Sequence, residues 1–160
     1  MLPNFMCIGA PKSGTTTLYE ILKQHPDVAV SSFKEPGFFD NESNWERGSD
    51  WYNQTYFSVV KNEKMIGEFT PSYLGSASAP ERILNTLGGD VKLILMLRNP
   101  VERAYSHFLH TQRDSFENLG FLEALSYEES RLEEVADLAS KFSYRSSGMY
   151  FQQIKNYLKF

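Results

Sequence analysis

Apolar residues along the chain alternate between short runs and helical spacings, a pattern typical of strands that alternate with helices. The segment from Asn4 to Ile8 is a short apolar run, and Leu18, Ile21 and Leu22 then recur at the spacing of one helix face. The run from Val28 to Val30 follows. These positions predict a strand, a loop, a helix and a second strand.

The same alternation continues in the middle of the chain. Met65 to Glu68 predicts a third strand, and a helical pattern starts at Ala79 and stops at two glycines. Val91 to Leu97 is the most apolar run, which predicts a central buried strand. Asn99 can cap the next helix and Pro100 suits its first position, so a helix is expected there.

Further helices are expected around Trp51, from Phe121 to Leu138, and through the final segment GMYFQQIKNYLKF. Within the second of these, the charged stretch EESRLEEV is interpreted as a solvated helix face. Strands that alternate with helices predict an α/β fold, a three-layer P-loop-type domain with a mainly parallel central sheet flanked by helices. In such sheets ligands bind at the carboxyl ends of the strands, where the polar motifs described below lie.

The composition narrows the class of protein. The chain has 160 residues, 41% of them hydrophobic, which suits one globular domain over residues 1–160. Its net charge of -4, without a basic run, argues against nucleic acid as a partner. No stretch approaches the roughly 20 apolar residues of a membrane span. Because Cys7 is the single cysteine, a reducing, cytoplasmic setting is expected.

The segment from Gly9 to Thr16, GAPKSGTT, has the frame of a phosphate-binding loop. It lies between a predicted strand and a predicted helix, where backbone N–H groups converge on an anion. The Walker A loop of proteins that bind nucleoside triphosphates has lysine directly after its second glycine. Here Thr15 takes that position and the lysine is Lys12. The loop therefore predicts phosphate binding of another kind.

PKSGTTTL resembles the 5′-phosphosulfate loop of sulfotransferases, enzymes that use 3′-phosphoadenosine 5′-phosphosulfate as the sulfuryl donor. The resemblance implies that the cofactor is bound by Lys12, Ser13, Gly14, Thr15, Thr16 and Thr17. Lys12 is then also catalytic, because it stabilises the charge that develops on the leaving phosphate. No metal is implied.

Three further segments resemble the same family. LRNPVERAYSHF resembles the 3′-phosphate segment, which implies cofactor binding by Arg98 and Ser106. SSFKEPGFFD resembles the segment of glycan sulfotransferases and their bacterial relatives that supplies a catalytic glutamate, which implies that role for Glu35. Most Phe and Tyr residues are expected in the core, with Phe38 and Phe39 as candidates to line the acceptor pocket. SSGMYFQQIKNYLKF is similar to the helix that follows the cofactor site in heparan-type N-sulfotransferases.

The resemblance implies a sulfotransferase that acts on a hydroxyl or amine of a small molecule or glycan. The chain departs from the family at Phe69, where glycan enzymes usually have lysine, which argues against a heparan-like acidic acceptor. The family also continues with a strand and a basic loop, so the domain is expected to be incomplete at its C-terminus.

The residues themselves leave two alternative functions open. One is an inactive nucleotide-binding fragment, and the other is a P-loop small-molecule kinase with Glu68 near a metal. Arg98 could equally form a structural ion pair with Glu102 or Glu68, and Glu35 could be an ordinary exposed loop acid.

Overall fold

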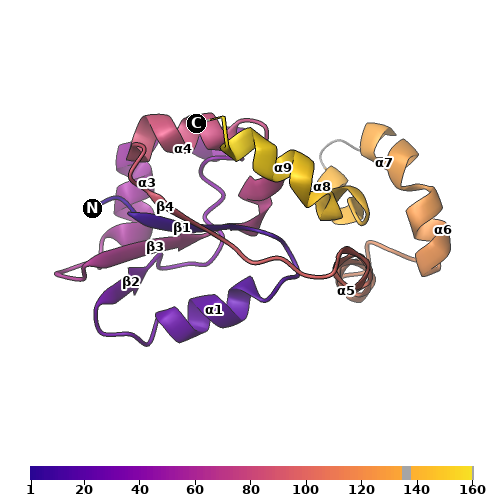
Figure 1. Ribbon diagram of the computed structural model, residues 1–160, viewed down its shortest axis with the longest axis horizontal. Coiled ribbons are helices and arrows are strands. Elements are labelled where there is room, and N and C mark those ends of the chain that lie inside the picture. The colour runs from indigo at the N-terminus through magenta and orange to yellow at the C-terminus, as the bar shows by residue number, and fades with distance from the viewer. Residues whose placement is uncertain (135–137, 160) are drawn as a thin grey trace. The chain divides into compact units, whose positions relative to one another are not determined.

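Four parallel strands organise the first part of the chain in the computed structural model, which describes residues 1–134 and 138–159. The strands are β1 (Phe5–Gly9), β2 (Val28–Val30), β3 (Met65–Phe69) and β4 (Lys92–Leu95), in the spatial order β2-β3-β1-β4 (Figure 1). In this register Phe5 lies opposite Gly67 of β3 and Lys92 of β4. Each pair of consecutive strands is connected through a helix, as parallel pairing requires. The predicted α/β fold with a parallel sheet is confirmed.

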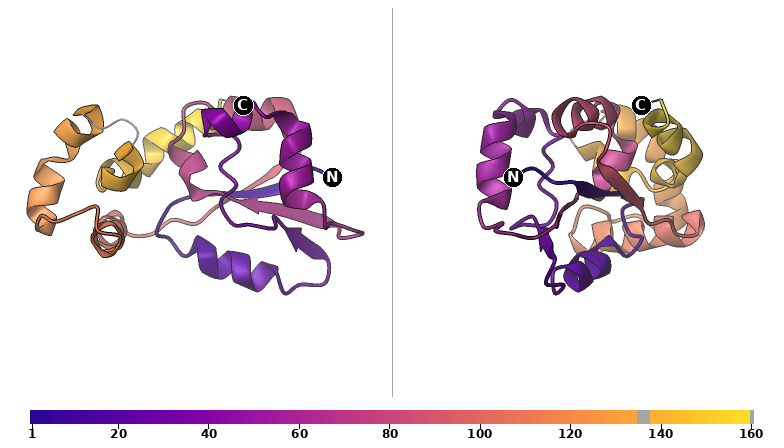
Figure 2. Two further views of the ribbon diagram at one scale, coloured as in Figure 1. Left: turned by 180° about the vertical axis from the view of Figure 1, so that it is seen from behind. Right: turned by 60° about the vertical axis from the view of Figure 1, so that its left-hand side comes forward.

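The helices of this part lie on both faces of the sheet. They are α1 (Thr15–Leu22), α2 (Glu42–Trp45), α3 (Gly48–Phe57), the 3-10 helix η1 (Pro71–Gly75) and α4 (Ala79–Leu87). In Figures 1 and 2, α1 covers one face of the sheet, whereas α3 and α4 cover the other. The helices expected around Trp51 and from Ala79 are confirmed, and α2 was not predicted. No helix in the described residues is long and apolar enough to span a membrane.

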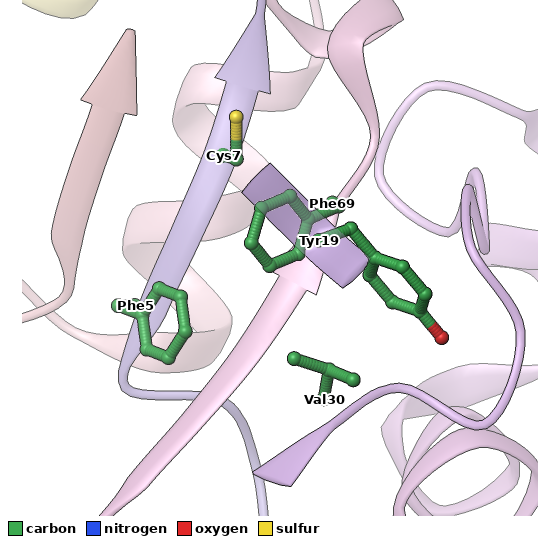
Figure 3. Packing of buried hydrophobic residues seen from close by; sticks show 5 residues of the cluster. All are labelled: Phe5, Cys7, Tyr19, Val30 and Phe69. Atoms are coloured by element: carbon green, nitrogen blue, oxygen red, sulfur yellow. The ribbon is translucent and has the colours of Figure 1, made fainter. Parts of the chain in front are cut away.

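The face of the sheet under α1 is closed by an apolar cluster of Phe5, Cys7, Tyr19, Val30 and Phe69 (Figure 3). The Phe69 ring meets the Phe5 and Tyr19 rings edge to face, with centroids 6.0 and 5.4 Å apart. The Tyr19 hydroxyl donates to the Ser31 carbonyl at 2.9 Å, which ties α1 to the exit of β2. Phe69 is therefore a core residue.

The run from Val91 to Leu97 does not form a central buried strand, so that prediction is wrong. Within the described part of the chain, β4 pairs with β1 alone and lies at the edge of the sheet. The Leu93 and Leu95 side chains are 36% and 37% exposed. The apolar run correctly indicated a strand, but strand order depends on tertiary pairing that a local pattern does not encode.

The chain divides into two compact units, of which the first comprises Met1–Leu97 with Gln152–Phe160 and the second comprises Arg98–Phe151. The second unit contains α5 (Pro100–Arg113), α6 (Phe121–Ser126), α7 (Glu128–Glu134), α8 (Ala139–Phe142), the 3-10 helix η3 (Ser146–Gly148) and the first residues of α9 (Tyr150–Tyr157). Its core is formed by Ala104, Phe108, Ala124, Phe142 and Tyr144. As expected, Asn99 caps α5, because its side chain accepts from Val101 N and Glu102 N.

The single helix predicted from Phe121 to Leu138 is wrong in its continuity. It is broken between α6 and α7, and residues 135–137 of the predicted helix lie outside the described residues. The charged stretch is not wholly a solvated face either, since Glu128 is 1% exposed. Its carboxylate accepts from Arg145 N at 2.6 Å and Ser146 N at 2.8 Å, so it anchors the segment that precedes η3.

Candidate active site

The loop between β1 and α1 has the backbone geometry of an anion site. Lys12 has φ 66° and Gly14 has φ 91°, both in the left-handed region. A Cβ added to Gly9 would lie 2.6 Å from the Leu74 Cβ and 3.1 Å from the Pro71 carbonyl, so the strand passes η1 too closely for any side chain. This contact and the two positive φ angles define how the chain turns from β1 into α1.

The N-terminus of α1 is open to an anion. Gly14 is the N-cap and offers no side chain, and the first turn carries no acidic residue. The first N–H groups of a helix have no partner inside it, so these donors are available to a ligand. The Ser13 hydroxyl oxygen is buried and has no hydrogen-bond partner among the described residues. Thr16 and Thr17 are exposed beside it, whereas Thr15 is buried.

This donor set fits the phosphate of a nucleotide. Uncapped helix donors, a buried hydroxyl without a partner and a lysine in the same loop together suit a dianionic group. The loop therefore offers the kinds of donor that a phosphate group accepts from.

Glu35 lies in the segment that follows β2 and has φ 63°, the left-handed region again. Its backbone N–H donates to the Phe69 carbonyl at 2.9 Å, which fixes this segment to the end of β3. The Glu35 side chain is 55% exposed and forms an ion pair with Lys34. Non-glycine residues with positive φ cost free energy, and Lys12, Glu35 and Ser115 are such residues in the described part of the chain.

The loop and the Glu35 segment lie at the same end of the parallel sheet, because both follow the carboxyl ends of strands. Lys34, which sequence reasoning did not single out, lies at this end of the sheet as well. Burial raises the pKa of the Cys7 thiol in β1, and the charge of Lys34 acts in the opposite direction.

The sequence led us to expect that Phe38 and Phe39 line an open pocket, but they do not. Both side chains are fully buried, and the Phe38 ring stacks on Tyr52 with centroids 4.3 Å apart. The segment after Glu35 is therefore anchored by core aromatics. Because apolar aromatic residues suit a core and a pocket equally well, the sequence alone did not separate these two roles.

Arg98 and Ser106 belong to the second unit, whereas Lys12 to Thr17 and Glu35 belong to the first. Arg98 lies just before α5, and its Nε is 3.2 Å from Glu102 Oε2. The two side chains are 42% and 62% exposed, and an exposed pair of this kind contributes little to stability. Ser106 is half-buried on α5. The ion pair with Glu102 is thus one of the alternatives that the sequence left open.

Sequence reasoning considered Glu68 as a possible neighbour of a metal and as a possible ion-pair partner of Arg98. The structure places its carboxylate inside the protein, where it accepts from the hydroxyls of Tyr52 at 2.6 Å, Thr70 at 2.5 Å and Tyr73 at 3.3 Å. Burial raises the pKa of Glu68 to about 7, although these hydrogen bonds act against the rise. The described residues contain no group of three or more His, Cys, Asp or Glu side chains that could hold a metal ion.

Comparison with known proteins shows the family of the chain. The family model described as "Sulfotransferase domain" matches residues 2–160. The chain belongs to the sulfotransferase domain family. A crystal structure of a sulfotransferase from Alicyclobacillus acidocaldarius matches this sulfotransferase domain with a TM-score of 0.88 and 34% identity, over 99% of this chain and 69% of that one.

Two curated relatives were compared with this sulfotransferase domain by sequence identity and by the share of each chain that is covered. It is 32% identical over 158 residues to human heparan sulfate glucosamine 3-O-sulfotransferase 6, covering 99% of this chain and 43% of that protein. It is 42% identical over 109 residues to the membrane-associated sulfotransferase kil1 of Dictyostelium discoideum, covering 67% of this chain and 22% of that protein. The chain therefore spans less than half the length of these relatives.

Proposed function

We propose that the protein transfers a sulfuryl group from 3′-phosphoadenosine 5′-phosphosulfate to a hydroxyl or amine of an acceptor, which we infer to be a glycan. The observation that carries the proposal is the open N-terminus of α1, where the buried Ser13 hydroxyl has no hydrogen-bond partner among the described residues. The family match supports the activity, and a relative named for heparan sulfate glucosamine supports the glycan.

In this proposal the loop binds the 5′-phosphosulfate end of the donor. The backbone N–H groups from Ser13 to Thr16 and the exposed hydroxyls of Thr16 and Thr17 donate to the phosphate. Lys12 stabilises the negative charge that grows on the bridging oxygen as the sulfur–oxygen bond breaks. Its left-handed backbone is held by the turn from β1 into α1.

Glu35 acts as the general base. It takes the proton from the acceptor hydroxyl or amine while that atom forms its bond to sulfur, and the nucleotide bisphosphate leaves with the electrons of the broken bond. The exposed Glu35 side chain, on a backbone fixed to Phe69, suits a base that must meet an acceptor from solution. General-base catalysis of this kind commonly contributes about 100- to 10,000-fold in rate.

Arg98 and Ser106 bind the 3′-phosphate, which ATP lacks. A guanidinium offers two parallel donors to a phosphate, and a serine hydroxyl adds a third. The pair with Glu102 is exposed, so exchanging it for a phosphate costs little.

The acceptor is proposed to be less acidic than heparan sulfate. Phe69, at the position where the family's glycan enzymes usually have lysine, is buried against Phe5 and Tyr19 and brings no cation to the acceptor. Neither alternative, the inactive nucleotide-binding fragment or the P-loop kinase, is favoured by a specific observation. A cytoplasmic setting also remains a prediction.

A transfer assay with labelled donor and a panel of neutral and acidic oligosaccharides tests the proposal. Glu35→Gln should lower kcat by at least about 100-fold and leave donor binding within about twofold, because the group acts on the acceptor's proton. Lys12→Ala should impair both. Glu20→Gln and Lys23→Ala, which change exposed residues on α1 and at its end, are the matched controls. Normal turnover by Glu35→Gln would refute the general-base assignment.

A further inference from the structure

Glu68 is a buried carboxylate at the end of β3, on the face of the sheet opposite Phe69. The side chain is fully buried, and three hydroxyls surround it: Tyr52 from α3, Tyr73 from η1, and Thr70 from the connection between β3 and η1. The Tyr52 and Thr70 hydroxyl oxygens lie 2.6 and 2.5 Å from the carboxylate oxygens. The proposed chemistry does not use this group.

Two of the three hydroxyls also hold the segment that carries Glu35. The Tyr73 oxygen accepts from Phe38 N at 2.9 Å and Phe39 N at 3.2 Å. The Thr70 oxygen accepts from Gly37 N at 3.3 Å. The Tyr52 hydroxyl, in contrast, bonds to Glu68 and to none of these amides. The three backbone amides that follow Glu35 and Pro36 are thus held by hydroxyls bound to Glu68.

The direction of these hydrogen bonds depends on Glu68. A hydroxyl has one proton, so Tyr73 and Thr70 can accept from the backbone only if their own protons point elsewhere. An ionised carboxylate is an acceptor alone and takes those protons. A protonated carboxyl or a carboxamide would bring a donor into this group. The hydroxyl that faces this donor would then lose the acceptor of its own proton.

We propose that Glu68 is a positioning residue for Glu35: by accepting the Tyr73 and Thr70 protons, it holds the backbone from Gly37 to Phe39 in place. Glu35 is then fixed on both sides, through its own N–H to the Phe69 carbonyl and through the amides that follow it. This inference rests on the proposed role of Glu35 as the base. It extends that role by explaining how an exposed loop side chain keeps a defined position.

The same geometry makes the hold on the segment sensitive to pH. Burial raises the pKa of Glu68 to about 7, so the acceptor-only form dominates above this pH and diminishes below it. Among the described residues, the titratable groups that interact with Glu68 include Asp40, Tyr52, Tyr56, Tyr73 and Tyr157. Burial raises the pKa of each of the four tyrosines, so near neutral pH they stay protonated and serve as hydroxyl donors.

The test compares Glu68→Gln with two phenylalanine variants that each remove one hydroxyl from Glu68. Tyr73→Phe also removes the acceptor for two amides, whereas Tyr52→Phe removes none, so Tyr52→Phe is the matched control. Hydrogen exchange is measured at the amides of Gly37, Phe38 and Phe39, with the β1 amides as an internal reference. We expect Glu68→Gln and Tyr73→Phe to accelerate exchange in the segment at least about tenfold over the β1 amides, and Tyr52→Phe to leave it near wild type.

Kinetics supply the second measurement. Glu68→Gln should lower kcat by about 10- to 100-fold, the cost of a misplaced catalytic group, and leave the Kd for adenosine 3′,5′-bisphosphate unchanged. The kcat of the wild type should rise as pH increases through about 7, and this rise should be absent in Glu68→Gln. If Glu68→Gln does not fold, Thr70→Val replaces it, with Thr70→Ser as the variant that restores the hydroxyl.

The outcomes separate this inference from the proposed function. Normal turnover by Glu35→Gln would refute the base, while hydrogen exchange would still show whether Glu68 holds the segment. Unchanged exchange in Glu68→Gln, or equal acceleration at the β1 amides, would overturn the positioning role. The positioning role would also be overturned if Glu68→Gln showed faster exchange but a normal kcat, while Glu35→Gln still lowered kcat.

Discussion

Replacing Glu68 by glutamine should change how the stability of the protein depends on pH. Burial raises the pKa of Glu68 from 4.5 to about 7 in the folded protein. Between these values the folded state keeps a proton that the unfolded state has released, so the free energy of unfolding falls as pH rises. At about 1.4 kcal/mol per pH unit, the loss is about 3 kcal/mol. Glutamine does not titrate and should lack this loss.

The measurement is urea unfolding followed by tryptophan fluorescence from about pH 5 to about pH 8.5, for the wild type and Glu68→Gln. The difference in unfolding free energy between the two proteins should shift by about 3 kcal/mol in favour of the variant as pH rises. Titrations common to both proteins cancel in this difference. Glu20→Gln, an exposed acid on α1, should follow the wild type. A difference that stays constant with pH would refute the assignment of a raised pKa to Glu68.

Two further predictions concern packing. Gly67→Ala should destabilise the protein by about 1–3 kcal/mol in urea unfolding, because the new Cβ would lie 2.1 Å from the Phe5 ring; a double variant with Phe5→Leu should recover part of the loss, and an unaffected single variant would contradict the packing. Glu128→Gln should cost about 1–3 kcal/mol, because a carboxamide offers one acceptor oxygen where two backbone N–H groups now bind a carboxylate, whereas the exposed Glu129→Gln should be neutral. Equal effects at these two positions would contradict the anchoring role of Glu128.

The alternation of short apolar runs and helical spacings was sufficient to predict the α/β fold. It located β1, β2, β3 and α4 closely, because each is bounded by turn residues that a sequence shows directly. The position of β4 at the sheet edge was not predictable in the same way. Strand order is set by pairing between distant segments, and the apolar run gives no information about it.

The sequence indicated some residues of the candidate site and missed others, because only some of them follow a local pattern. The loop at Lys12 and the segment at Glu35 follow strand ends, where the fold concentrates polar function. Glu68 was overlooked as a structural centre because a single glutamate in a strand pattern gives no sign of the three hydroxyls that surround it. Those partners come from elements that only the folded chain brings together. The burial of Glu128 was missed because the helix break before it has no glycine or proline signal.

The proposed nucleotide specificity can be tested by calorimetric titration with adenosine 3′,5′-bisphosphate without magnesium and, separately, with ATP and magnesium. The account predicts that the bisphosphate binds more tightly, because Arg98 and Ser106 recognise a 3′-phosphate that ATP lacks. Arg98→Ala should weaken the bisphosphate by about 10- to 100-fold, as expected for a lost charge-assisted hydrogen bond, and leave adenosine 5′-phosphate unaffected. Arg113→Ala, an exposed arginine at the other end of α5, is the control. Equal affinity for the bisphosphate and ATP, or tighter binding of ATP with magnesium, would contradict the assignment of this chain to sulfuryl transfer from 3′-phosphoadenosine 5′-phosphosulfate.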